Sequence, residues 1–232
     1  MTSLALDIDI INPALHGRDF NYPGDFGPGR PNKPILEFNH ITGWRDYLLS
    51  LQIRSAKVPA IHADAYHVAL RMLLLAWVEP AVIKSAEMQA MRSLEAALVG
   101  VYFQCVFERE QAKHDRARQR CGGCKKCMLC AALVREKFRP GLGVFLDYMA
   151  AHDGLDPALH NESKKTTGNA LNFIRNGLAH GDPFNGLPWG GLLEAVRDVM
   201  EHAHRNLPEL TMSYVDTSGV EMQTGHPTTG LF

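Results

Sequence analysis

The segment Glu87–Cys105, EMQAMRSLEAALVGVYFQC, decides the fold. Its apolar residues recur at alternating intervals of three and four, which places their side chains on one face of a helix. The members of this apolar seam are Met91, Leu94, Leu98, Val101 and Cys105. We therefore expect a helix that begins near Ser85, buries the whole seam against neighbouring helices and frays after Glu108.

Further helices are predicted on both sides of this segment. Before it lie Trp44–Ile53 and an apolar segment that ends at Pro80; after it lie Leu142–Ala151, a segment from Asp156-Pro157 to His180, and a last helix opened by Pro188. Length favours a helix before Pro80, although the dense run Leu70–Val78 would also fit a buried strand. Together these elements predict an all-α fold, a bundle of helices.

The chain is expected to have one helical domain with irregular ends. Residues 1–42 are rich in Pro, Gly and Asn and show no sustained periodicity, so they are predicted to be an extended arm. The helical domain covers residues 43–206, with an insertion at about 108–140, and residues 207–232 form a tail. A length of 232 residues with 46% hydrophobic content is enough for one core.

Charge is distributed unevenly along the chain. The formal net charge is only −1, but residues 109–139 hold ten Lys and Arg against three Asp and Glu, a net of +7, which leaves −8 elsewhere. The basic segment is either a solvated insertion or a surface that contacts a phosphate backbone.

No membrane or export signal is apparent. The start of the chain contains Asp7 and Asp9 without a basic stretch, and the longest apolar run, His67–Val78, is too short to span a bilayer. A cytoplasmic protein is the expectation.

Four cysteines follow one another at intervals of three: Cys121, Cys124, Cys127 and Cys130. This spacing is typical of turns that wrap thiolates around iron–sulfur clusters, but the fourth cysteine comes one residue too early for the ferredoxin pattern and lacks its proline. Zinc sites with four cysteines usually join two Cys-x-x-Cys pairs through a longer loop than Lys125-Lys126. Zinc, an iron–sulfur cluster and a reducible thiol cluster all remain open.

The predicted helix that runs to His180 has a polar end at 171–181, LNFIRNGLAHG. Leu171, Ile174 and Leu178 form its core stripe, while the polar side chains Asn172, Arg175, Asn176 and His180 are expected to gather on an adjoining face. A guanidinium binds phosphate in a fork, and an imidazole moves protons near neutral pH, so this pair suits a phosphodiester. The plainer interpretation is an exposed Arg and a His that interacts with the helix dipole. Glu95 either supports Arg175 or is solvated.

Arg175-Asn176-x-x-x-His180 resembles the R-x(4–6)-H motif of the HEPN superfamily. The resemblance extends to Glu87–Tyr102, which is similar to an earlier helix of such domains that often contains a Leu-Glu step, and to the order of the helices around the motif. It covers about residues 83–206 and implies a helical bundle of HEPN type.

The resemblance also implies an activity, because HEPN proteins with this motif are often metal-independent endoribonucleases of the toxin or defence type. His180 would be the general acid or base, Arg175 would hold the phosphate, and Asn176 would orient His180 or the substrate, with no cofactor for catalysis. A homodimer would supply a second imidazole, and a neutralising protein partner is possible for a toxin.

Two alternatives stay open. One is a non-catalytic HEPN-like module for dimerisation or for binding RNA or a partner, with a metal-stabilised insertion. The other is an iron–sulfur sensor protein built on a helical scaffold.

Overall fold

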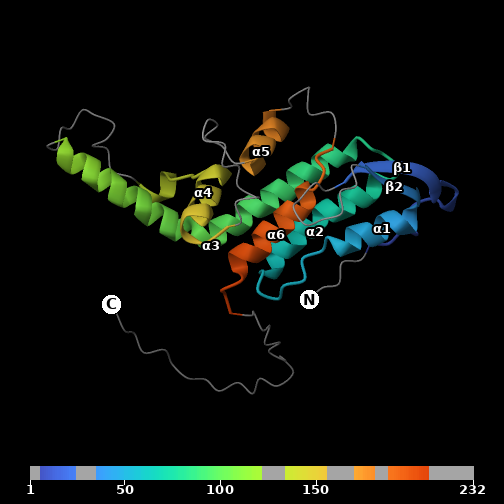
Figure 1. Ribbon diagram of the computed structural model, residues 1–232, viewed down its shortest axis with the longest axis horizontal. Helices are drawn as coiled ribbons and strands as arrows, with labels where there is room; N and C mark the ends of the chain where they lie inside the picture. The colour runs from blue at the N-terminus through green and yellow to red at the C-terminus, as the bar shows by residue number, and fades with distance from the viewer. Residues whose placement is uncertain (1–5, 25–34, 122–133, 156–169, 181–187, 209–232) are drawn as a thin grey trace, which may run out of the picture.

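The computed structural model of the protein describes residues 6–24, 35–121, 134–155, 170–180 and 188–208. Its helices in these ranges are α1 (Ile41–Ser50), α2 (Ala60–Leu75), α3 (Val82–Arg120), α4 (Leu142–His152), α5 (Ala170–His180) and α6 (Leu192–His204), with short turns η1 (Pro13–Leu15) and η3 (Arg135–Lys137). Two strands, β1 (Gly17–Pro23) and β2 (Ile35–His40), form a small sheet (Figure 1). The fold is mainly helical as predicted, but it is not all-α.

Helix α3 is the central element, since α2, α4, α5 and α6 all pack against it (Figure 1). Met91, Leu94 and Leu98 of the predicted seam are fully buried. Val101 is partly buried against the core, but the prediction is wrong at the end of the seam, because Cys105 is exposed and Val106 is buried instead. A straight helix has 3.6 residues per turn, so a repeat of 3.5 drifts off the buried face by roughly 20° per heptad.

Helix α3 also continues far beyond Glu108, where fraying was expected. Residues 108–120, EREQAKHDRARQR, consist mostly of strong helix formers and carry side-chain pairs one turn apart, such as Lys113 with Glu110 at 2.7 Å and Gln111 with Asp115 at 2.9 Å. The predicted insertion therefore begins as a continuous helix, and its residues 122–133 lie outside the described residues.

By length and composition alone, α3 contains a stretch apolar enough to cross a membrane. Met91, Leu94 and Leu98 of this stretch are enclosed by the other helices of the bundle, whereas Val99 is 40% exposed.

The predicted N-terminal arm contains the small sheet. Strands β1 and β2 pair antiparallel, with Phe20 opposite Phe38. Phe20 and Tyr22 are buried, and their rings lie 4.9 and 5.1 Å from that of Trp44. The indole of Trp44 in turn donates a hydrogen bond to the carbonyl of Leu73 at 2.9 Å. The arm is therefore part of the core, and α1 begins at its last strand.

The start of α6 is fixed by a buried carboxylate. Glu87 is fully buried and accepts hydrogen bonds from the backbone N–H of Trp189 at 2.6 Å and from Lys84 at 3.0 Å. Burial raises the pKa of Glu87. Gly190 approaches the carbonyl of Gly24 so closely that a Cβ would lie 2.2 Å from that oxygen. This junction ties α6 to α3 and to the end of β1.

The other end of α6 is joined to α4 by a charged pair. Arg205 donates to both carboxylate oxygens of Asp153, at 2.6 and 2.9 Å, and Tyr102 of α3 donates to the same carboxylate. The hydrogen bonds from Arg205 lower the pKa of Asp153. Helix α4, the neighbour of α5, is thus held firmly on α3.

Candidate functional site

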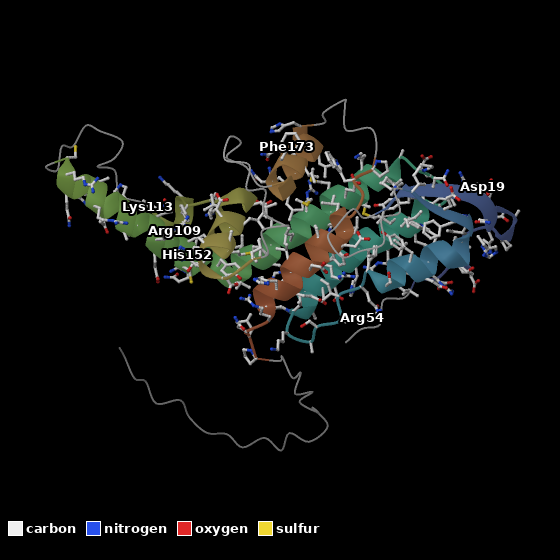
Figure 2. All side chains as sticks on the ribbon, viewed as in Figure 1. Asp19, Arg54, Arg109, Lys113, His152 and Phe173 are labelled. Atoms are coloured by element: carbon white, nitrogen blue, oxygen red, sulfur yellow. The ribbon has the colours of Figure 1, made fainter. Side chains whose placement is uncertain are left out.

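Helix α5 lies on α3 and α4 through the predicted apolar stripe. Leu171 is buried, and Ile174 and Leu178 are partly buried against the core. Phe173, on the other side of the helix, is 66% exposed (Figure 2). The inner face of α5 is therefore set by packing, while its outer face is open and partly apolar.

Arg175 leans onto α3 from this inner side. Its Nη2 donates to Oε2 of Glu95 at 3.3 Å, and the two side chains are only 35% and 26% exposed. Its Nη1 lies 3.4 Å from the amide oxygen of Asn176. Glu95 is therefore a partner of Arg175 rather than a solvated residue, and Arg175 is oriented by two neighbours.

A pocket of about 340 Å³ opens between α3 and α5 at this ion pair. It is lined by Met88, Met91, Arg92, Glu95, Arg175, Leu178 and Ala179. The lining holds two Arg residues and one Glu, so the pocket carries a net positive charge beside apolar walls. Such a pocket suits a small anion with an apolar portion. The sequence analysis missed Arg92, although it lies three residues before Glu95 on the same side of the helix.

His180 does not share this pocket with Arg175 in one chain. It is the exposed last residue of α5, and five residues of helix place it about 140° around the axis from Arg175. Asn172 points elsewhere again: its Nδ2 lies 3.0 Å from the position that a Cβ on Gly143 of α4 would occupy. The expected gathering of four polar side chains is therefore split, because the apolar stripe turns Arg175 inward and His180 outward.

Of the four clustered cysteines, only Cys121 is in the described part of the chain, directly after α3. The predictions for Cys124, Cys127 and Cys130 lie outside it. Among the described residues, no group of three or more His, Cys, Asp or Glu could hold a metal ion. His114 is two helical turns before Cys121 on the same face, and within the described ranges neither of its buried ring nitrogens has a hydrogen-bond partner.

No family model, no curated protein and no solved structure matches this chain. The case for a function therefore depends on the pocket and the surfaces described above.

The pocket predicts competition between Glu95 and an anion for Arg175. Replacing Glu95 by Gln removes the competing charge, so a 3′-nucleoside monophosphate should bind about fivefold more tightly. This factor corresponds to the loss of one surface ion pair of ~1 kcal/mol. Arg175→Gln should weaken the same binding. Isothermal titration calorimetry measures both.

The matched control is Glu108→Gln, which removes the same charge from an exposed position of α3 and should leave the affinity unchanged. Equal effects at Glu95 and Glu108 would show that only net charge matters and would contradict an anion site in the pocket.

Proposed function

We propose that the protein is a HEPN-like, metal-independent endoribonuclease, a toxin- or defence-type effector that acts in the cytoplasm as a homodimer. The observation that carries the proposal is Arg175, held half-buried in a positively charged pocket on the helix that ends at His180. The HEPN assignment is supported by the motif and by the mainly helical fold.

The proposed reaction needs only the RNA and the protein. The 2′-OH of the substrate attacks the adjacent phosphorus, the bond to the 5′-oxygen breaks, and the products carry a 2′,3′-cyclic phosphate and a 5′-hydroxyl. Arg175 and Arg92 hold the phosphate and stabilise the charge that develops on it. An imidazole from His180 takes or gives the proton. The Glu95 carboxylate keeps Arg175 in place until the phosphate replaces this carboxylate as its partner.

A second copy of the chain would bring an imidazole to each pocket. Phe173, Asn176, Gly177 and His180 fall within an arc of about 100° on the outer face of α5. Asn176 also contacts Arg175, so the outer face borders the pocket. A two-fold contact between these outer faces would bury Phe173 and bring the partner's His180 to the edge where Asn176 borders the pocket.

The separation of Arg175 from His180 within one chain favours a second candidate. This is a non-catalytic HEPN-like module in which the pocket binds RNA or a partner and α5 serves dimerisation. An iron–sulfur sensor is the weaker alternative, since it depends on the cysteines alone.

Two substitutions test the enzyme. His180→Ala should lower the rate of RNA cleavage by about 10²–10⁴, the usual loss for a general acid or base, and Arg175→Ala by about 10²–10³. Cleavage should persist in excess chelator, yield 2′,3′-cyclic phosphate and fail on DNA, which lacks the nucleophile. Gel assays and mass spectrometry of the products provide the readout.

His152→Ala and Arg118→Ala are the controls, since both residues are exposed and lie on other helices. Full activity in folded His180→Ala protein would exclude the enzyme and leave the non-catalytic module.

The dimer has its own test. Phe173→Glu should dissociate the protein and abolish cleavage, because it places a charge in the proposed contact. Ile61→Glu is the matched control: Ile61 is 74% exposed but lies on α2, so this variant should remain dimeric and active. Light scattering gives the oligomeric state. A monomeric wild type that still cleaves RNA would contradict the shared site.

We also propose that Cys121, Cys124, Cys127 and Cys130 hold a structural metal, zinc or an iron–sulfur cluster, with His114 as a further candidate ligand. Elemental analysis should find about one metal centre per chain, with sulfur neighbours at about 2.3 Å for zinc. Cys124→Ser should reduce the content, whereas Cys105→Ser, on the exposed side of α3, should not. Protein with neither zinc nor iron would contradict this proposal.

A further inference from the structure

The free end of α3 carries a row of cations on one face. Arg109, Lys113, Arg116 and Arg120 follow at intervals of four, three and four, so they share an arc of about 60° and extend over roughly 16 Å. Lys113, Arg116 and Arg120 are exposed, and the last buried residue of α3 is Val106. These four cations are called the basic stripe below.

Part of this charge is unpaired. Glu110 pairs with both Arg109 and Lys113, at 3.2 and 2.7 Å. Arg116 and Arg120 have no ion-pair partner among the described residues. Two full positive charges are therefore exposed at the tip, and two partly balanced ones lie nearer the bundle.

The basic stripe lies on the same side of α3 as the pocket. Eighteen residues, five whole turns, separate Glu95 from Lys113, so their side chains leave the axis in the same direction. Between them α4 covers this face, with Tyr148 under the guanidinium of Arg109 at 5.5 Å. Figure 1 shows the end of α3 projecting beyond α4, and Figure 2 labels Arg109 and Lys113 there. Along the axis, Arg109 is about 21 Å and Arg120 about 38 Å from Glu95.

The chemistry of the basic stripe favours a nucleic-acid backbone over a membrane. A helix that lies on a membrane needs large apolar side chains beside its cations. The residues next to the stripe are small or polar: Glu108, Ala112 and Gln119 on one flank, Glu110 and Ala117 on the other. A row of cations, three of them exposed, without an apolar strip beside it matches phosphates, which are bound largely through counterion release.

We propose that the basic stripe binds the backbone of a single-stranded RNA whose scissile phosphate lies in the Arg92/Arg175 pocket. The inference rests on the proposed function and adds a binding surface remote from the chemistry. An RNA long enough to cover both surfaces gains affinity from the stripe, whereas a dinucleotide in the pocket does not reach it.

The test compares opposite faces of the same helix. Arg116→Gln removes a charge from the basic stripe, and Arg118→Gln removes the same charge from the other side of α3. Fluorescence anisotropy with a labelled 30-nucleotide RNA, at several salt concentrations, should show weaker binding for Arg116→Gln. The association constant falls as salt is added, and the steepness of log K against log salt should decrease by about 0.7 for each phosphate that the protein no longer neutralises. For Lys113→Gln/Arg116→Gln the expected decrease is about 1.4. Arg118→Gln should keep the wild-type slope.

Cleavage assays separate this inference from the enzyme proposal. Arg116→Gln should lower kcat/KM for the long RNA and leave cleavage of a dinucleotide unchanged. If the wild-type protein binds RNA through the basic stripe without cutting it, the proposed nuclease activity is contradicted and the proposed RNA-binding surface stands. Equal slopes for wild type, Arg116→Gln and Arg118→Gln, or binding to anionic vesicles but not to RNA, would overturn the stripe.

Discussion

A helix of 39 residues with one apolar face is stable only if other elements cover that face, and α3 imposes this requirement on the whole chain. Each buried Leu or Met on it contributes about 1.5–3 kcal/mol, so the contacts along Met91, Leu94 and Leu98 outweigh any single polar interaction in the molecule. Helices α2, α4, α5 and α6 each supply part of the cover. Val106 is the last buried residue of α3, and among the described residues the helix beyond Arg109 is supported by local side-chain pairs and helix propensity.

The packing of α5 on α3 explains why Arg175 lies at the pocket and pairs with Glu95. Helix α5 is short and is held on the bundle by Leu171, Ile174 and Leu178, so the direction of Arg175 follows from apolar packing. The ion pair with Glu95 is partly exposed and is worth at most about 1 kcal/mol. A pair of that strength orients the guanidinium yet can be exchanged for a phosphate, whereas a fully buried pair would resist exchange. The Glu95 carboxylate therefore orients Arg175 without preventing a phosphate from binding to it.

Periodic features were predictable from the sequence, and features that depend on distant pairing were not. The burial of Leu94 and Leu171 follows from local spacing, which a single sequence displays. The β-hairpin was missed because its strands show only a short alternation and gain stability from Trp44, which follows them in sequence. Arg175 and His180 are close in sequence but about 140° apart around α5, so proximity along the chain did not make them one site. To predict whether two residues of a short helical motif form one site, the angle between them around the helix axis is needed as well as their spacing in sequence.

The near-zero net charge of the chain conceals a directional arrangement along α3. Its first half buries apolar side chains and holds Arg92 at the pocket, and its free end carries Arg116 and Arg120 into solvent on the side that Glu95 also faces. Since electrostatic attraction between exposed charges fades over about 8–10 Å at physiological salt, the two surfaces act on a ligand only locally. A polyanion long enough to reach from one surface to the other would meet both sets of cations, and the helix fixes how long it has to be. The same helix around which the core is packed thus sets the reach of the proposed binding surface.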